Sequence, residues 1–185
     1  MTAPDLRAAL ATAEVIHDRV ALEAAIARMA GEIAAEYAND ARPPLYLTVM
    51  HGGLPFAAAL AMELGTRGVD LEFDYLHATR YRGQTSGSGL AWLHRPETPM
   101  QGRRVLLADD ILDEGHTLLA VKRWCEDQGA ADVRVAVLAV KLHDRRVEGI
   151  EADHVGVEVP DRYVFGYGMD YHEQGRNLPA IYALG

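Results

Sequence analysis

The segment at residues 105–118, VLLADDILDEGHTL, constrains the fold of this chain more than any other. Its first four residues are apolar, and so short a run is typical of a strand that is buried on both faces of a parallel sheet. The residues EGHT at 114–117 form a tight turn, and an apolar helix face starts at Leu118. The segment therefore predicts a strand, a polar loop and a helix over residues 117–127 of an α/β fold.

Three carboxylates lie at the carboxyl end of this expected strand. Asp109 and Asp110 follow residue 108 directly, and Asp113 comes shortly after them. In an open α/β sheet, ligands bind where strands end and helices begin. Carboxylates accept hydrogen bonds from a sugar diol, whereas loop amides and a helix N-terminus bind phosphate. The segment is therefore suited to binding a ribose 5-phosphate.

The rest of the chain alternates between strand and helix patterns. Helices are expected at residues 5–12, 18–37 and 54–64, with Asp18 as an N-cap, and strands at 45–50, 69–76, 133–140 and 151–159. Residues 13–17 are expected to be extended, and the chain from Pro160 onward to be irregular. Strand, helix and strand at this spacing form a βαβ unit, so we expect one domain with a parallel sheet.

Composition excludes several classes of protein. The 185 residues, 49% of them apolar and 24% charged, are those of an ordinary globular protein. Lys and Arg number 18 against 27 Asp and Glu, and the net charge of −9 argues against a nucleic-acid binder. No apolar run approaches the roughly 20 residues of a membrane span, and no signal peptide is evident. The single cysteine, Cys125, is expected to be a core thiol in the reducing cytoplasm.

Metal-ligand spacing argues against zinc. The eight histidines include no HExxH motif and no pair four residues apart, and one cysteine cannot form a cysteine pair. Mg²⁺ suits the carboxylates better, because one or two carboxylates and substrate oxygens suffice to bind it.

The segment at 105–118 resembles the phosphoribosyl-diphosphate signature of type I phosphoribosyltransferases, and five segments over about residues 45–180 resemble the hypoxanthine-guanine members. The resemblance implies a single-domain α/β fold with a parallel sheet and a small hood subdomain. We expect the core at about residues 41–159 and the hood at 1–40 and 160–185. The resemblance also implies that Asp109 and Asp110 bind the ribose hydroxyls and Mg²⁺.

The same resemblance implies roles for the loop at residues 113–117, which follows the two aspartates. Asp113 is implied to be the catalytic carboxylate that faces the purine N7. The residues that bind the 5′-phosphate are then Glu114, Gly115, His116 and Thr117. Glu114 departs from the Thr or Ser that is common in the family, and we expect its carboxylate to point away from the phosphate.

The resemblance also implies residues that bind the diphosphate and a loop that closes over the reaction. His51 and Gly52 match the family's diphosphate-binding loop, in which the Met50–His51 peptide would be cis, and Arg176 matches a diphosphate-contacting arginine. Many relatives have Lys in place of His51, so only the backbone role carries over. Arg80 and Tyr81 match the start of a flexible loop that closes over the reaction, although Ser is commoner than Arg80.

The purine site is implied by residues near the C-terminus. Lys141 matches a lysine that contacts the purine O6, Tyr163 a residue that stacks on the base, and the Val164 backbone would meet the N1/C2 edge. An ammonium can only donate a hydrogen bond, so it suits a 6-oxo group and disfavours adenine. Asp170 matches a residue that contacts Mg²⁺ directly or through water.

These matches predict an enzyme of purine salvage that joins hypoxanthine or guanine to phosphoribosyl diphosphate with Mg²⁺. The product would be IMP or GMP together with diphosphate. The family also implies a homo-oligomer, either a dimer or a tetramer. Two alternatives stay open: a phosphoribosyltransferase that prefers xanthine or a pyrimidine, and a non-catalytic regulator that senses phosphoribosyl diphosphate.

Overall fold

A computed structural model describes residues 5–80 and 90–185 of the chain. Its helices are α1 (Leu6–Thr12), α2 (Arg19–Tyr37), α3 (Leu54–Thr66) and α4 (His116–Asp127). Its strands are β1 (Glu14–His17), β2 (Leu45–Val49), β3 (Glu72–Arg80), β4 (Leu90–His94), β5 (Arg104–Leu112), β6 (Asp132–Lys141), β7 (His154–Val159), β8 (Val164–Phe165) and β9 (Ile181–Ala183).

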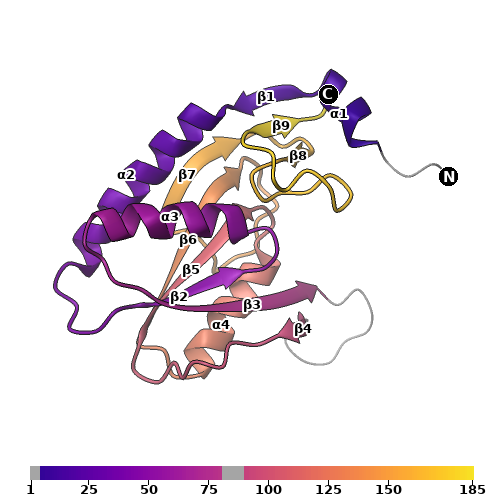
Figure 1. Ribbon diagram of the computed structural model, residues 1–185. Helices are drawn as coiled ribbons and strands as arrows, with labels where there is room; N and C mark the ends of the chain where they lie inside the picture. Colours follow the sequence, from indigo (N-terminus) through magenta and orange to yellow (C-terminus); the bar gives the residue numbers. More distant parts are fainter. Residues whose placement is uncertain (1–4, 81–89) are drawn as a thin grey trace.

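The main sheet has six strands in the order β4-β3-β2-β5-β6-β7 (Figure 1). Strands β3, β2, β5, β6 and β7 are parallel, as the βαβ spacing predicted. The edge strand β4 pairs antiparallel with β3, an arrangement that parallel sheets often carry at one edge. The order places β2 and β5 at the centre of the sheet, so the loops that follow them lie side by side at its carboxyl edge.

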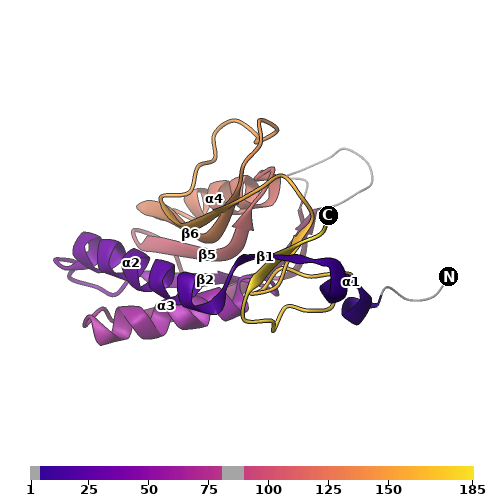
Figure 2. The ribbon, with the colours of Figure 1, turned by 90° about the horizontal axis from the view of Figure 1, so that it is seen from above.

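Helices cover both faces of this sheet. Figure 2 shows α2 and α3 on one face and α4 on the other. The strand side chains alternate accordingly: Tyr46 and Leu106 pack on the α2–α3 side, and Leu45 and Leu107 on the α4 side. All four are fully buried. Because both faces are covered, the strands are continuous apolar runs, which explains the pattern at 105–108.

Two helix predictions are confirmed at their N-termini. The Asp18 side chain accepts a hydrogen bond from the Ala21 N–H at 2.8 Å and so caps α2. The turn at 114–117 leads into α4, which begins at His116, one residue before the expected start. No helix among the described residues is both long and apolar enough to cross a membrane.

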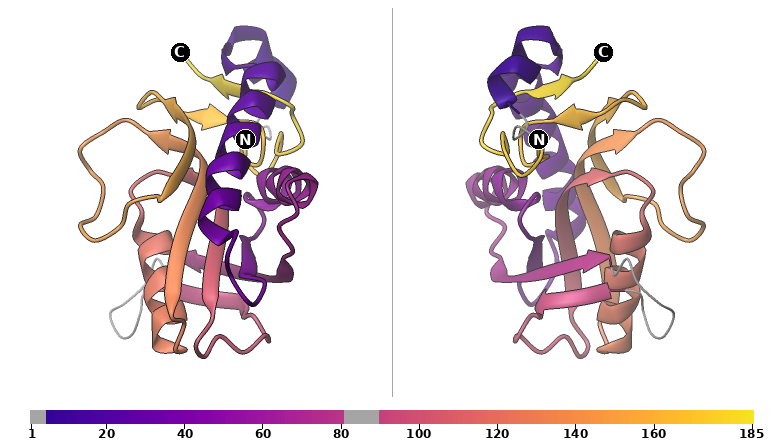
Figure 3. Two further views of the ribbon diagram at one scale, coloured as in Figure 1. Left: turned by 90° about the vertical axis from the view of Figure 1, so that its left-hand side faces the viewer. Right: turned by 90° about the vertical axis from the view of Figure 1, so that its right-hand side faces the viewer.

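A second sheet of three strands lies beyond the carboxyl ends of the main strands, as the side views in Figure 3 show. Its order is β1-β9-β8, with both pairings antiparallel. The expectation that residues after Pro160 are irregular is wrong for β8 and β9. These strands are two and three residues long and depend on pairing with β1, so no local pattern reveals them. The division of the chain into core and hood stays a prediction.

Strand β5 is longer than the apolar run predicted. It continues to Leu112, because its pairing with β6 extends through Asp109 with Val137 and Leu112 with Val140. Asp109 and Asp110 therefore belong to the strand instead of following it. Both side chains nevertheless lie at the carboxyl edge of the sheet, where they line one cavity.

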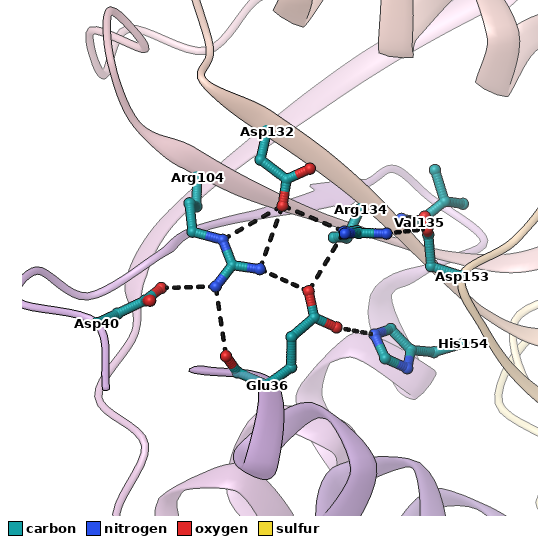
Figure 4. A network of polar contacts seen from close by, with 8 residues as sticks. All are labelled: Glu36, Asp40, Arg104, Asp132, Arg134, Val135, Asp153 and His154. Atoms are coloured by element: carbon teal, nitrogen blue, oxygen red, sulfur yellow. Dashed lines mark hydrogen bonds and ion pairs between the residues drawn. The ribbon is translucent and has the colours of Figure 1, made fainter. Parts of the chain in front are cut away.

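A network of charged side chains ties together the opposite edge of the sheet, where β5 and β6 begin (Figure 4). At its centre, Arg104 bonds to Asp40 and Asp132 and lies 4.0 Å from the centre of the Tyr37 ring. The other members are Glu36, Arg134, Asp153 and His154. The network joins α2 to β5 and β6 far from the carboxyl edge, so its role is structural.

Candidate active site

A cavity of about 850 Å³ opens at the carboxyl ends of β2, β3, β5 and β6. It lies where ligands are expected in an open α/β sheet. The side chains or backbone of nearly all predicted site residues line it: His51, Gly52, Asp109, Asp110, Asp113, Glu114, Gly115, His116, Thr117, Lys141, Tyr163, Val164, Asp170 and Arg176. Of the remaining two, Arg80 ends β3 and its side chain is not described, and Tyr81 lies outside the described residues.

Asp109 and Asp110 form an acidic pair in the floor of the cavity. The side chain of Asp109 accepts a hydrogen bond from the Asp110 N–H at 2.9 Å, and Asp110 is only 8% exposed. Burial raises the pKa of Asp109 well above its usual range, and the neighbouring Asp110 charge raises it further. Burial likewise raises the pKa of Asp110. The pair therefore holds unfavourable negative charge that a cation or a hydroxyl donor would stabilise.

We expect Asp109→Asn to stabilise the ligand-free protein at neutral pH, by on the order of 1 kcal/mol. A carboxyl whose folded pKa is raised loses stability as pH rises from its unfolded pKa, about 3.9, toward the folded value. The gain should therefore be present at pH 7 and vanish below about pH 3, where the carboxyl is largely protonated in both states. Thermal unfolding across this pH range measures it.

Asp70→Asn provides a matched control for this substitution. Its exposed side chain also accepts a hydrogen bond from the next N–H, at 2.9 Å. We expect it to leave the unfolding temperature unchanged. If Asp109→Asn has no effect at any pH, the charge repulsion inferred for the pair is absent.

The loop after β5 is shaped for an anion. Gly115 has φ +83°, a left-handed conformation that glycine adopts without strain, and it caps the N-terminus of α4. A Cβ on Gly115 would lie 2.6 Å from the Ile150 Cγ2 atom, so the turn also packs closely. The N–H groups of the first helical turn have no partners within the helix, and residues 115–118 line the cavity.

The loop after β2 packs directly on the acidic pair. The Met50–His51 peptide is cis, which confirms the prediction from the resemblance. A Cβ on Gly52 would lie 2.1 Å from Asp110 Oδ2, so glycine alone allows this approach. The backbone of this loop therefore packs against the Asp110 carboxylate.

Asp113 contacts two side chains, one at the end of β6 and one two residues beyond it. Its Oδ2 atom accepts from Lys141 Nζ at 2.6 Å and its Oδ1 atom contacts His143 Nε2 at 2.7 Å. The lysine contact follows from register, because Leu112 pairs with Val140 and the next residues are Asp113 and Lys141. The Lys141 side chain is 13% exposed, so it is not the solvated charge usual at a strand end.

The C-terminal segment closes one side of the cavity. Arg176 donates to the Gly168 carbonyl at 2.8 Å and forms an ion pair with Asp170 at 2.8 Å. The Tyr163 hydroxyl donates to the Asp170 carbonyl at 3.2 Å, and Tyr163 as a whole is 45% exposed. The Tyr163 ring therefore offers a face for stacking.

Two histidines near the site were missed by the sequence analysis. His77 on β3 lines the cavity with its ring centre 4.3 Å from that of His51. Burial lowers the pKa of His77, and the charges of His51 and Arg176 lower it further. His143 lies two residues beyond Lys141 and could have been found only by following the β5–β6 register past the strand ends.

The acidic pair suits Mg²⁺ in one respect. Among the described residues, no group of three or more His, Cys, Asp or Glu side chains is arranged to hold a metal. Mg²⁺ does not need such a group, because it is usually bound through one or two carboxylates together with substrate oxygens. The unfavourable charge of Asp109 and Asp110 is of the kind that a cation would offset, so these residues fit the ion.

Comparison with known proteins agrees with this geometry. A family model described as the phosphoribosyl transferase domain matches residues 12–174. The hypoxanthine-guanine phosphoribosyltransferase of Streptococcus pneumoniae is 35% identical over 171 residues, which are 92% of this chain and 91% of that protein. The enzyme of the same name from Bacillus subtilis is 35% identical over 160 residues, 86% of each chain.

The fold has a close counterpart among solved structures. A hypoxanthine phosphoribosyltransferase mutant from Trypanosoma cruzi, described as a ternary substrates complex, superposes with a TM-score of 0.87. Its sequence is 29% identical, and the match covers 95% of this chain and 97% of that one. The parallel sheet, the smaller sheet at its carboxyl edge and the cavity between them are thus a type I phosphoribosyltransferase fold. This chain belongs to the phosphoribosyl transferase domain family and, within it, to the hypoxanthine-guanine phosphoribosyltransferases.

Proposed function

We propose that this protein joins hypoxanthine or guanine to phosphoribosyl diphosphate in purine salvage. In this reaction the purine N9 forms a bond to C1′ of the ribose, the bond from C1′ to the diphosphate oxygen breaks, and the electron pair leaves with the diphosphate. The proton on N7 passes to the Asp113 carboxylate. IMP or GMP and diphosphate are the products.

The observation that carries the proposal is the pairing of Lys141 with Asp113 at 2.6 Å inside the cavity. O6 and N7 lie on the same edge of a 6-oxopurine, the first an acceptor and the second, when protonated, a donor. An ammonium beside a carboxylate is complementary to that edge. Lys141 would leave Asp113 for O6 as the base enters, and Asp113 would then face N7.

The remaining residues bind and orient the two substrates. Asp109 and Asp110 accept hydrogen bonds from the ribose hydroxyls. The backbone of residues 114–117 and the Thr117 hydroxyl bind the 5′-phosphate at the N-terminus of α4. Catalysis then consists mostly of positioning and of stabilising charge on the leaving group.

Separate segments act on the diphosphate and on the base. The backbone of His51 and Gly52, with the Arg176 side chain, binds the diphosphate. The Tyr163 ring stacks on the purine and the Val164 backbone meets its N1/C2 edge. The loop that starts at Arg80 and Tyr81 excludes water during the transfer. The smaller sheet forms a hood over the base, with the hood assigned to about residues 1–40 and 160–185 and the core to 41–159.

Asp109 and Asp110 would hold Mg²⁺, with Asp170 contacting it directly or through water. The bound ion would supply neutralisation of charge on the leaving diphosphate. Asp170 forms an ion pair with Arg176, so it would have to exchange that partner to contact the ion. Chelation with EDTA should abolish the transfer reaction.

We expect hypoxanthine and guanine to be converted, and adenine to react at least about 10²-fold less efficiently. A 6-amino group would present a donor to the Lys141 ammonium, which itself only donates. Product formation from each base with phosphoribosyl diphosphate and Mg²⁺ measures this. Turnover of xanthine or uracil alone would support the alternative substrate classes, and a protein that binds phosphoribosyl diphosphate without turnover would be a sensor.

We also propose that the chain is a homo-oligomer, a dimer or tetramer, that works in the cytoplasm. Large exposed apolar side chains on the edge strand β4 and on its neighbour β3 support assembly: Leu93 is 67% exposed and Phe73 is 63% exposed. The free thiol of Cys125 is buried, as suits a reducing compartment. Light scattering on the purified protein gives its mass, and a monomer at micromolar concentration would contradict the first part.

A further inference from the structure

His143 lies against the carboxylate to which the proposed function assigns the purine proton. Its side chain is only 2% exposed, and its Nε2 atom lies 2.7 Å from Asp113 Oδ1. Asp113 itself is 41% exposed toward the cavity. The histidine therefore lies behind the carboxylate, on the side away from the substrate space.

The hydrogen bonds around the ring determine which nitrogen carries the proton. His143 Nδ1 accepts from the Arg145 backbone N–H at 3.1 Å. A neutral imidazole has one donor and one acceptor nitrogen, so Nε2 carries the hydrogen and donates it to Asp113. The ring is thus placed as a hydrogen-bond donor to Asp113.

Lys141 and His143 occupy different oxygens of the carboxylate. Lys141 bonds Oδ2 and His143 bonds Oδ1. Burial would raise the pKa of Asp113, but the hydrogen bonds from these two residues outweigh it, and the pKa is lowered. Other charged groups close to this pair are Arg145, Asp161, Glu114 and Arg146. Arg145 and Asp161 bind each other at 2.6 Å, and Arg146 donates to the Lys141 carbonyl at 3.3 Å.

We infer that His143 is a positioning residue for the transfer reaction, which holds the Asp113 carboxylate in place while Lys141 moves to the purine O6. The inference rests on the proposed function, in which Lys141 changes partner. Without His143, that change would leave Asp113 with neither of its two donors, free to rotate about its side-chain torsions. With His143, one oxygen stays bound and the other is directed at N7.

Three variants test this inference. His143→Leu removes the donor but keeps an apolar side chain of similar bulk, and His143→Gln restores an N–H near the position of Nε2. His154→Leu is the matched control, because His154 is also buried and its Nε2 contacts a carboxylate, Glu36, at 3.2 Å (Figure 4). That site lies at the opposite edge of the sheet.

We expect His143→Leu to lower kcat about tenfold or more, with the KM for phosphoribosyl diphosphate changed less than about twofold. The acidic limb of the kcat/KM profile should move to higher pH, because the carboxylate loses a donor that stabilises its charged form. His143→Gln should recover most of kcat and return the limb toward its original position. His154→Leu should lower the unfolding temperature without moving the limb.

A second measurement does not depend on activity. In the parent protein, ¹⁵N spectra of His143 at neutral pH should show Nε2 protonated and Nδ1 unprotonated, and ¹³C titration should show the Asp113 carboxyl titrating at lower pH than in His143→Leu. A protein inactive with every base would contradict the proposed function. The spectra would still test whether His143 donates a hydrogen bond to Asp113. An active parent with unchanged kcat and limb in His143→Leu, or the opposite tautomer in the spectra, would overturn the inference.

Discussion

Asp113→Asn is expected to lower kcat by about 10²- to 10³-fold while leaving the binding of phosphoribosyl diphosphate within a few-fold of the parent. Asparagine keeps the size of the side chain, and its Oδ1 can still accept from Lys141 or His143. It cannot take a proton from the purine N7. The loss should therefore fall on the chemical step, which steady-state kinetics with hypoxanthine and calorimetric binding of phosphoribosyl diphosphate together measure.

Asp144→Asn is a suitable control for the charge change. Asp144 is an exposed carboxylate three residues beyond Lys141, on the neighbouring loop. Its neutralisation alters the net charge equally but removes no group from the cavity lining. We expect kcat to stay within about twofold. Equal turnover in Asp113→Asn and the parent would remove Asp113 from the mechanism.

The second large effect is expected at Gly168, where three segments of the site meet. Gly168 has φ +107°, and a Cβ there would lie 2.1 Å from the Gly52 carbonyl oxygen and 3.1 Å from Asp110 Cβ. Backbone strain of about 1–3 kcal/mol would add to a similar cost for overpacking. We expect Gly168→Ala to destabilise the protein by about 3 kcal/mol or more, which lowers the unfolding temperature by roughly 6 °C or more.

The same substitution should also reduce activity, because the clash pushes the diphosphate loop away from the acidic pair. Gly68→Ala separates the two causes. Gly68 has φ +79°, and a Cβ there would meet nothing within 4 Å. It should cost only about 1 kcal/mol of strain and leave kcat unchanged. Similar melting temperatures for the two variants would show that the close approach at Gly168 is not a constraint.

The segment at 105–118 shows which structural features can be predicted from local sequence. The apolar run at 105–108, the turn and the helix that follows are local features, and the structure has a strand, loop and helix there as β5 and α4. Resemblance added the loop at His51 and the cis peptide that precedes it. Both kinds of information concern residues close to one another along the chain.

Contacts between segments far apart in the chain could not be predicted from local sequence or from the resemblance. Lys141 was expected to reach the purine, but its bond to Asp113 depends on the β5–β6 register. Strands β8 and β9 form only because β1, more than a hundred residues earlier in the chain, pairs with β9. His143 and His77 have no distinguishing neighbours in sequence, and they became visible as site residues only once the sheet brought them to its edge.

The sequence alone determined the α/β class, the order of the elements around the acidic signature and the identity of most residues that line the cavity. The class and the order of the elements follow from apolar periodicity and turn chemistry, whereas most of the site residues follow from the resemblance to type I phosphoribosyltransferases. Tertiary structure decided which charges face each other, how deeply Asp109 and Asp110 are buried and that His143 supports Asp113. Such properties depend on strand register and on packing between segments far apart in the chain, which no local pattern encodes.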